Sequence, residues 1–517
     1  MFVANMALRD VLAFLRNRLG GQRLAIAEKP RRKVWWRALL GFQHDKAQPA
    51  RDTAWLDGLR GVAAFLVMTY HFHLAWFNPF ELEVPYGATE DAIDLWRLPF
   101  LRLWMCSGHA QVSIFFVLSG FVLSWSSLAS IRAGRLEKIA KSLGSAVFRR
   151  WLRLYLPCFV IAGWYFLAFW FHIIDIGGLG GVKKREANFF LQLWDYIRAN
   201  ERFANPFNVN RDQWTALHEY EATMWTIPYE FAGSLLVFMV LVAICRIREY
   251  NRRTLITVGL ALYAGADGRW AFWLFASGVV LADYIRQRGG FQAISQTQNI
   301  RMTIVWSLVF IFGLYIAGFP EPNPEWKAVG YQPFVALTPS SWAHIEGGGR
   351  FWWCWAGIII ISSASHLSGV RRVFDISFAR YLGKISYMLY LTHRIVLRLL
   401  GEPLKAALLS AFGREKFINV PAGDSLGHMI TTLVIYVMLM GVLAPIALFV
   451  AHWVSKFVDE PSVWFAKWVD DFFTKGSSQP PPDTNRAHTD EEGVRLLQAE
   501  MDELSTHHGP TASHYPV

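Results

Sequence analysis

The chain has 517 residues, of which 53% are apolar without counting its 39 glycines and only 18% are charged. An ordinary soluble domain has about 45–50% apolar residues with glycine included and about 25% charged residues. This balance excludes a disordered, collagen-like or disulfide-stapled protein and predicts that lipid surrounds most of the chain. The formal net charge of +11 does not indicate nucleic-acid binding, because the basic residues gather beside apolar segments, where they orient a membrane protein.

Residues 1–54 form a basic segment that we expect on the cytoplasmic side of a membrane. Within it, residues 6–19 (MALRDVLAFLRNRL) are amphipathic and predict a helix lying on the membrane surface. The segment lacks the apolar core and the small-residue cleavage site of a secretory signal, whereas an Arg-rich mitochondrial presequence remains an alternative interpretation.

Ten later runs are apolar, and most approach the roughly 20 residues that a membrane-spanning helix needs. The fifth and sixth runs are separate helices only if residues 264–269 (AGADGR) form a tight turn. The ten runs are 57–77, 110–128, 154–174, 227–246, 254–267, 269–285, 302–319, 351–366, 380–400 and 429–453.

The loops between these runs predict the topology, because short cytoplasmic loops accumulate Lys and Arg. Basic loops follow the even-numbered runs at 132–153, 246–253, 286–301 and 371–380, and the intervening loops are acidic or mixed. The sequence therefore predicts an all-α polytopic membrane protein with about ten transmembrane helices and both termini cytoplasmic. We divide it into the basic segment, a membrane domain at 55–468 and a polar cytoplasmic tail at 469–517, expected to be disordered.

Four cysteines are scattered singly along the chain, without a CxxC pair or another metal-binding spacing. We interpret them as small apolar packing residues. They are Cys106, Cys158, Cys245 and Cys354.

The first run contains the sharpest candidate site, in the motif WLDGLRGVAAFLVMTYHFH at 55–73. Arg60 and His71 are eleven residues apart, so in a helix they return to within roughly 20° of one face, roughly 16 Å apart along the axis. Asp57 lies three residues before Arg60 and can pair with it, whereas His73 points elsewhere. Ionisable groups inside a membrane are usually functional, which predicts a cavity shared by Arg60 and His71. The alternative is an interfacial arginine and a packing histidine.

A second cluster, FRRWLRLYLP at 148–157, begins the third run. Arg150 and Arg153, and Arg149 and Arg153, have helical i, i+3 and i, i+4 spacing, so their guanidinium groups share a face. Such a fork suits phosphate, because arginine forms bidentate, charge-assisted hydrogen bonds. A topological anchor that binds lipid headgroups is an equally open interpretation.

Two further polar residues lie within apolar runs. Glu230 follows in WTIPYE, near the start of the fourth run, and His393 lies inside the ninth run. A carboxylate and a neutral imidazole are the usual groups for proton transfer. Each is also compatible with a structural polar contact between helices.

Several motifs together give the chain a resemblance to the acyltransferase 3 family of integral membrane O-acyltransferases, especially fungal members. They run from about 55 to 461 and include the pair Arg60 and His71, VSIFFVLSGFVLS at 112–124, the pair Arg150 and Arg153 before YLP, WTIPYEF, LGKISYMLYLTH and the closing VDEP. One departure is Gln111, which stands where a glycine often precedes the FF-x-x-SGF motif.

The resemblance implies ten helices and transfer of an acyl group, expected to be acetyl, from cytosolic acyl-CoA to a hydroxyl of a sugar, lipid-linked or small-metabolite acceptor. His71 would then be the general base, and Arg60 would hold the acyl-CoA or position His71. Arg150 and Arg153, with Arg149, would bind the CoA phosphates.

In the same interpretation Glu230 takes part in catalysis, and Asp57 and His393 tune the site or bind the acceptor. Acyl-CoA is a co-substrate, no bound cofactor or metal is expected, and lipid is the other partner. The plasma membrane or an endomembrane is the expected location. The alternative is a non-catalytic transporter or acyl-flipping protein that uses the buried Arg, His and Glu as a relay.

Overall fold

The computed structural model describes residues 52–77, 83–88, 95–178, 181–206, 217–321, 329–414 and 425–475. Contacts divide the chain into a unit Arg37–Asp470 and a second unit, Met1–Trp36 with Asp471–Val517. The first unit is described below. The basic segment and its predicted surface helix lie outside the described residues, apart from residues 52–54.

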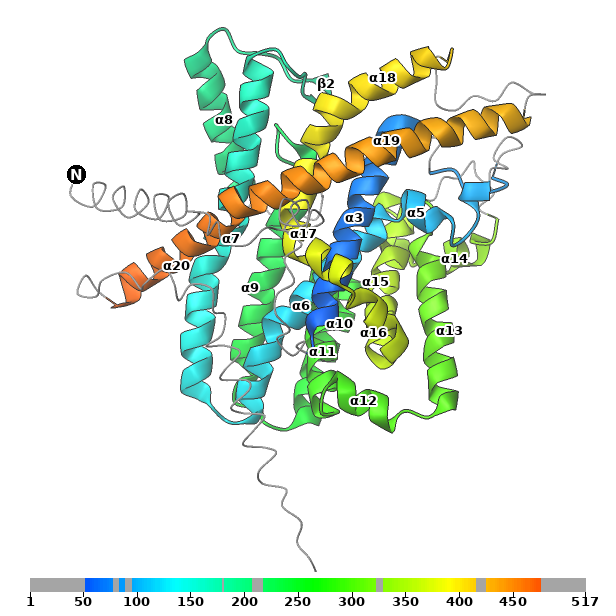
Figure 1. Ribbon diagram of the computed structural model, residues 1–517. Coiled ribbons are helices and arrows are strands. Elements are labelled where there is room, and N and C mark those ends of the chain that lie inside the picture. Colours follow the sequence, from blue (N-terminus) through cyan, green and yellow to red (C-terminus); the bar gives the residue numbers. More distant parts are fainter. Residues whose placement is uncertain are drawn as a thin grey trace, which may run out of the picture. The chain divides into compact units, whose positions relative to one another are not determined.

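Each of the ten predicted runs coincides with a helix (Figure 1). These helices are α3 (Ala54–Phe77), α6 (Gly108–Arg132), α7 (Leu136–Trp170), α9 (Thr226–Ile244), α10 (Tyr250–Ala266), α11 (Trp270–Gln287), α13 (Ile300–Ala317), α15 (Gly349–His366), α17 (Ser377–Val396) and α19 (Ser425–Val454).

Shorter elements connect them, and two of these, η6 and η7, are π-helical turns. The two-residue strands β1 (Gly177–Gly178) and β2 (Gly181–Val182) pair antiparallel between α7 and α8. The short helices are η1 (Leu95–Arg97), α5 (Arg102–Cys106), α8 (Phe189–Ala204), η3 (Ala222–Trp225), α12 (Phe291–Thr297), α14 (Gln332–Leu337), η4 (Ser340–Trp342), η5 (Glu346–Gly348), α16 (Ser368–Phe374), η6 (Leu397–Gly401), α18 (Glu402–Ala411), η7 (Ser455–Asp459) and α20 (Glu460–Lys475).

In the described part of the chain, five helical segments are long and apolar enough to cross a membrane, judged by length and composition. They are α6, α7, η3 with α9, α13, and the continuous run Ile430–Thr474; a sixth is added if α15 and α16, bent by 108°, count as one span. α10 has 17 residues, and α3 and α17 carry polar side chains, so these helices depart from a simple apolar span. Ten crossings therefore remain a prediction.

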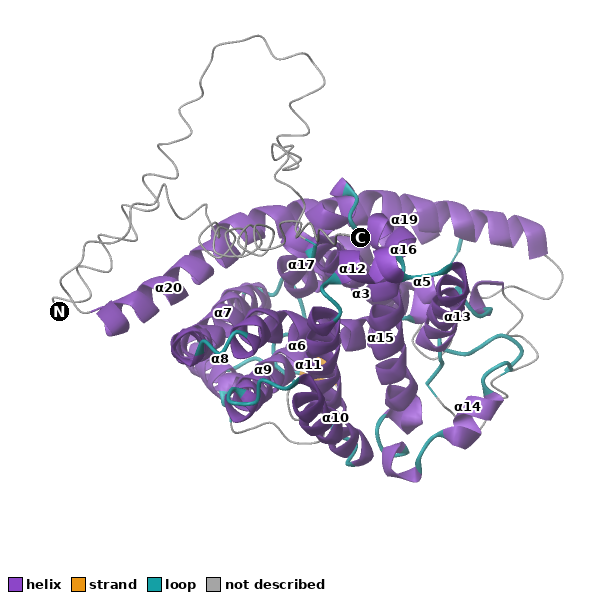
Figure 2. Cartoon of the chain, turned by 90° about the horizontal axis from the view of Figure 1, so that it is seen from below, coloured by secondary structure: helices purple, strands orange, loops and turns teal. Residues whose placement is uncertain are grey.

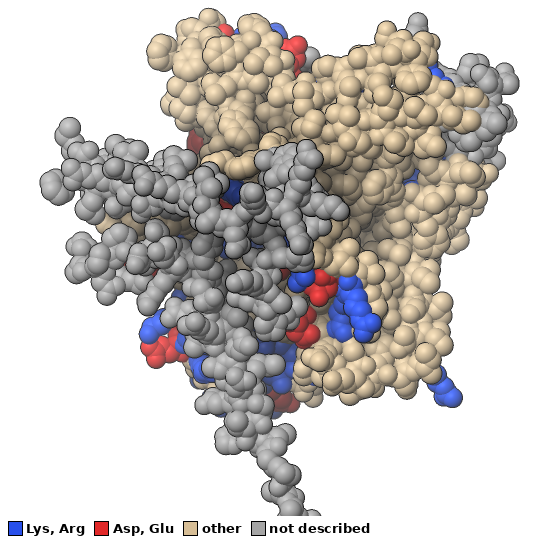
Figure 3. Space-filling view, in the orientation of Figure 1, with Lys and Arg blue, Asp and Glu red and all other residues tan. Residues whose placement is uncertain are grey.

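The surface over α13 fits a lipid environment. Only 17% of its apolar window is buried within the protein, and Ile304, Leu308 and Ile311 are exposed. Figure 3 shows few charged side chains on the side where Figure 1 places α13, while charged groups gather toward the lower end of the same face. α19 runs across the other helices in both ribbon views (Figures 1 and 2).

Helices α3 and α17 pack closely enough to exclude any side chain at their crossing. A Cβ atom on Gly61 would lie 2.2 Å from the backbone nitrogen of Gly383, and a Cβ on Gly383 would lie 2.3 Å from the carbonyl oxygen of Asp57. Ten residues further along both helices, the rings of His71 and His393 meet, so the two helices run parallel. Small residues allow such backbone contact between membrane helices.

The predicted turn between the fifth and sixth runs is confirmed. α10 ends at Ala266 and α11 begins at Trp270, and Gly268 has φ +69, a conformation that favours glycine. Three of the four cysteines are buried and Cys245 is partly buried, and all four are free thiols, as the packing interpretation expected. The helix α20 continues past residue 468 to Lys475, and residues 476–517 of the predicted tail lie outside the described part.

Candidate active site

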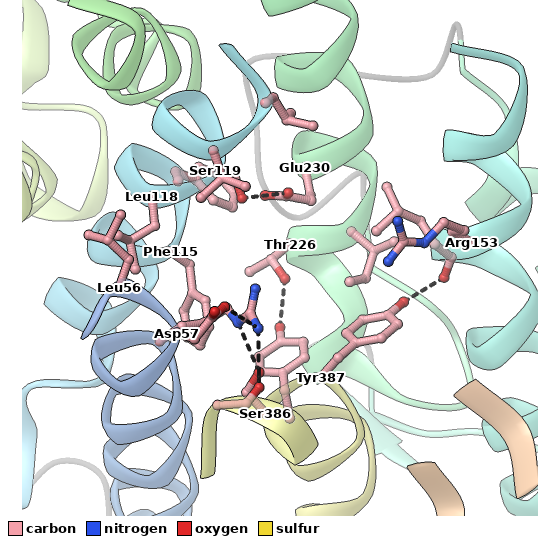
Figure 4. Close-up of a pocket in the computed structure, with 18 of the residues that line it drawn as sticks. Leu56, Asp57, Phe115, Leu118, Ser119, Arg153, Thr226, Glu230, Ser386 and Tyr387 are labelled. Atoms are coloured by element: carbon pink, nitrogen blue, oxygen red, sulfur yellow. Dashed lines mark hydrogen bonds and ion pairs between the residues drawn. The ribbon is translucent and has the colours of Figure 1, made fainter. Parts of the chain in front are cut away.

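A cavity of about 270 Å³ lies between α3, α6, α7, α9, α17 and η7 (Figure 4). Its walls combine apolar side chains such as Phe115 and Leu118 with a group of ionisable and hydroxyl side chains. We call this space the arginine cavity. Its polar lining residues are Asp57, Arg60, Ser119, Arg150, Arg153, Thr226, Glu230, Lys384, Ser386, Tyr387, Tyr390 and Asp459.

Arg60 is held by both helices of the close crossing. Its Nη2 lies 3.0 Å from Asp57 Oδ1 and donates to the carbonyl oxygen of Gly383 at 3.2 Å, while its Nε donates to Ser386 Oγ at 3.2 Å. The predicted pair of Asp57 and Arg60 is therefore present. Their side chains are 45% and 40% exposed, so the cavity is open on this side.

Arg150 joins α7 to α9 inside the cavity. Its Nη2 lies 2.5 Å from Glu230 Oε1, and its Nε donates to Ser234 Oγ at 2.9 Å. Ser119 on α6 donates to the same carboxylate oxygen of Glu230 at 2.7 Å, across the cavity in Figure 4. Because a partly buried arginine is paired with a partly buried carboxylate, each offsets the desolvation of the other.

The three arginines of the predicted fork do not share one environment. Arg150 and Arg153 line the cavity. Arg149 is not among the lining residues; its Nε lies 3.5 Å from Asp470 Oδ2 and donates to the carbonyl oxygen of Ser145 at 3.3 Å. On a helix, adjacent residues diverge by about 100°, which turns Arg149 away from Arg150.

His71 and His393 form a pair beyond the arginine cavity. Their ring centroids are 4.8 Å apart, and His393 is fully buried. Each Nδ1 lies near the carbonyl oxygen of the preceding turn, at 2.9 Å from Val67 for His71 and 3.1 Å from Leu389 for His393. A carbonyl oxygen can only accept, so in the neutral rings Nδ1 carries the hydrogen and Nε2 is the free base.

The prediction that Arg60 and His71 face one cavity needs a correction. The lining residues extend as far as Thr226 and Tyr390 and do not include His71 or His393. The eleven-residue separation explains this, because it sets His71 roughly 16 Å further along α3 than Arg60. The two residues belong to successive levels of one bundle.

His73 points away from the pair, as predicted, and both of its ring nitrogens have polar partners. Its Nδ1 lies 3.3 Å from the Met105 carbonyl oxygen and its Nε2 lies 3.0 Å from the Tyr436 hydroxyl. Gln111 is also accommodated, because its Nε2 donates to Ser107 Oγ at 3.1 Å.

A separate polar network lies near the C-terminal half of α3. Tyr70 donates to Glu83 Oε1 at 2.9 Å and lies 3.2 Å from His109 Nε2. His109 Nδ1 lies 3.4 Å from Arg350 Nη2, and Arg350 pairs with Glu346. Burial raises the pKa of the Glu83 carboxyl to about 7. The network brings Glu83 and Glu346 to the same end of the bundle.

The acyltransferase 3 profile, described as an acyltransferase domain, matches residues 53–452, which include every described helix from α3 to α18 and nearly all of α19. The chain belongs to the acyltransferase 3 family. With its several apolar helices, this acyltransferase is a multi-pass membrane protein.

Three fungal relatives align along most of their length with this acyltransferase. O-acetyltransferase PaAT-1 of Phomopsis amygdali is 27% identical over 85% of this chain and 88% of its own. Acyltransferase clz18 of Cochliobolus lunatus is 24% identical over 82% and 96%, and acyltransferase R4 of a Phoma species is 23% identical over 80% and 95%. No solved structure matches the chain.

Seven polar residues of the acyltransferase cavity were not singled out from the sequence. Each lies in a motif that carried the family resemblance: one in VSIFFVLSGFVLS, one in WTIPYEF, four in LGKISYMLYLTH and one in VDEP. The motifs were a usable signal, but the side chains facing inward become evident only once the helices are packed. They are Ser119, Thr226, Lys384, Ser386, Tyr387, Tyr390 and Asp459.

Proposed function

We propose that this acyltransferase moves an acyl group, expected to be acetyl, from cytosolic acyl-CoA to the hydroxyl group of an acceptor. The observation that carries the proposal is the arginine cavity, in which Arg60, Arg150 and Arg153 line one space between the helices. The name of the Phomopsis amygdali relative, an O-acetyltransferase, supports acetyl as the group and oxygen as its destination.

We assign acyl-CoA, the donor, to the arginine cavity because the cavity carries positive charge and is open on one side. Guanidinium groups bind phosphate through charge-assisted hydrogen bonds, and CoA carries several phosphates. The partly exposed pair of Asp57 and Arg60 is the expected entrance, because the cavity is open there. CoA is an elongated molecule whose thiol is distant from its phosphates, so phosphates held at Arg150 and Arg153 leave the thioester free to extend toward His71.

The chemical step is assigned to His71. Its Nε2 takes the proton from the acceptor hydroxyl while that oxygen attacks the thioester carbonyl carbon. The tetrahedral intermediate then collapses: the carbon–sulfur bond breaks, the CoA sulfur receives the proton from the imidazolium, and the ester and free CoA leave. The contact between Nδ1 and the Val67 carbonyl supports this assignment, because it keeps Nε2 available as the base.

Purified protein in lipid nanodiscs tests the proposal. With acetyl-CoA and an alcohol acceptor present, the wild-type protein should release free CoA thiol and form an acetyl ester, whereas His71→Gln should do neither above background. Binding of CoA without ester formation or thiol release in the wild-type protein would favour the transporter alternative.

A further inference from the structure

Next to His71, a group of buried and partly buried polar side chains plays no part in the proposed donor site. We call it the Glu221 cluster: Tyr165 on α7, Glu221 before η3, His393 and Arg394 on α17, and Arg398 in η6. Glu221 acts electrostatically on both His71 and His393. The cluster therefore adjoins the proposed reacting centre on the side opposite the arginine cavity.

Glu221 uses one carboxylate oxygen and leaves the other without a bond. Oε1 accepts from the Thr223 backbone N–H at 2.9 Å and from Thr223 Oγ1 at 2.6 Å, and it lies 3.4 Å from Arg394 Nη1. Oε2 is buried and has no hydrogen-bond partner in the described part of the chain. Buried carboxylate oxygens are normally bonded, so this oxygen needs a donor.

Two neighbours of Glu221 also have a buried polar atom without a hydrogen-bond partner in the described part of the chain. The Tyr165 hydroxyl lies close enough to Glu221 to interact with it but makes no hydrogen bond of good geometry among the described residues, and Arg398 lies over the Tyr165 ring, 6.0 Å from the centroid. His393 Nε2 is fully buried and is an acceptor, because Nδ1 is the nitrogen bonded to Leu389. Among the described residues, neither the Tyr165 hydroxyl nor His393 Nε2 has a hydrogen-bond partner.

The backbone beside the cluster is unusual as well. α17 passes directly into the π-helical turn η6 at Leu397, three residues after Arg394. The other π-helical turn of the described chain, η7, ends at Asp459, which lines the arginine cavity. π-Helical turns are rare and frequently mark functional sites, and here one adjoins each end of the proposed reaction path.

We propose that the Glu221 cluster binds the acyl acceptor and selects a diol, in which the reacting hydroxyl has a second hydroxyl on the neighbouring carbon. The inference rests on the proposed function. One hydroxyl approaches His71 and reacts, and the other donates to Glu221 Oε2 or His393 Nε2 and accepts from Tyr165. A monoalcohol has no group for these atoms once its hydroxyl is placed at His71.

Two variants remove the predicted contacts with little change of shape. Tyr165→Phe deletes only the hydroxyl. Glu221→Gln keeps an oxygen that can accept from Thr223, but its amide NH2 group replaces the unpaired carboxylate oxygen and cannot accept a hydrogen bond. Tyr155→Phe is the matched control, because Tyr155 lies on the same helix and its hydroxyl is also buried without a partner in the described part, yet it belongs to neither site.

The experiment compares 1,2-dodecanediol with 1-dodecanol as acceptors of acetyl from acetyl-CoA in nanodiscs, with the ester measured by mass spectrometry. We expect the wild-type KM for the diol to be at least about tenfold below that for the monoalcohol, since a site built to bond a hydroxyl rejects the analogue that lacks it. Tyr165→Phe and Glu221→Gln should bring the two KM values together with CoA affinity unchanged. Tyr155→Phe should preserve the difference.

Three outcomes would overturn the inference. Equal wild-type KM values would mean that the cluster holds only ordered water. An undiminished preference in Tyr165→Phe and Glu221→Gln would assign the selectivity elsewhere. Failure to acetylate either probe, while acetyl-CoA is still consumed in a His71-dependent manner, would reject the diol site and leave the proposed function intact. Loss of that His71-dependent consumption would instead reject the proposed function.

Discussion

At the scale of single residues, His71 and His73 lie two positions apart on α3 yet have unrelated surroundings. His71 lies against His393, whereas His73 contacts Met105 and Tyr436. We expect His71→Gln to lower kcat by about 10² to 10⁴, the usual contribution of a positioned base, with CoA affinity retained. Glutamine preserves size and hydrogen bonding but cannot take up the proton.

His73→Ala is the control, and the structure changes what it should do. Removing a buried, doubly bonded imidazole costs about 1–3 kcal/mol of stability, so less folded protein is expected. The kcat of the folded fraction should remain close to wild type. Activity that survives in His71→Gln, measured as ester formed per folded molecule, would transfer the catalytic assignment to His393 or Glu230.

The arginines allow a similar matched comparison. Arg150→Ala and Arg153→Ala should each weaken CoA binding by about tenfold or more, because each removes charge-assisted bonds of roughly 1.5–3 kcal/mol. Lysine at either position should restore only part of the affinity, since a point charge does not replace a fork. Titration calorimetry with CoA gives the measurement.

Arg149→Ala tests whether position or charge alone matters. Arg149 precedes Arg150 but contacts Asp470 and does not line the cavity, so its loss should leave CoA affinity within about twofold of wild type. Equal losses in all three variants would mean that these arginines act through their summed charge and not as a binding site.

The residue scale also shows how far sequence reasoning reaches. Helical spacing was sufficient to pair Asp57 with Arg60 and to turn His73 away from His71, because both depend on one helix alone. It did not reveal that the lining of the arginine cavity excludes His71 or that Glu221 lies near the histidines. Those facts depend on which helices pack together, and no periodicity within one helix encodes that.

At the scale of elements, the ten helices were predictable because each contains an apolar run bounded by polar loops. Their packing was not. The crossing of α3 and α17 depends on Gly61 and Gly383, whose glycine character is needed only because two backbones meet there. This crossing brings both Ser386 to Arg60 and His393 to His71, so it assembles the cavity and the histidine pair together.

Gly61→Ala should therefore abolish activity by separating the two helices, since its Cβ would lie 2.2 Å from a backbone nitrogen. We expect a large fall in thermal stability, measured by fluorescence-detected size exclusion after heating. Gly259→Ala on α10, where a Cβ meets nothing within 4 Å, is the control and should be neutral or slightly stabilising. Wild-type stability in Gly61→Ala would show that α3 and α17 do not approach this closely in the membrane.

At the scale of the whole molecule, the remaining question is how many helices cross the membrane. Length and composition support five or six spans in the described part, whereas the alternation of basic and acidic loops favours ten with both termini cytoplasmic. The fold adds one independent constraint. Glu83 and Glu346, which the ten-span arrangement assigns to the same non-cytoplasmic side, are joined through Tyr70, His109 and Arg350.

Cysteine labelling distinguishes these arrangements, and the structure selects exposed positions for it. In a variant without the four native cysteines, Leu95→Cys and Ala343→Cys should react with an impermeant maleimide in sealed cells or vesicles of known orientation from the non-cytoplasmic side. Arg135→Cys, at the exposed turn between α6 and α7, should react only from the cytoplasmic side, as should tags at both termini. If Arg135→Cys and Ala343→Cys were labelled from one side, the ten-span arrangement would be wrong. The basic loops next to the arginine cavity would then no longer place its entrance in the cytoplasm, where CoA is expected to bind.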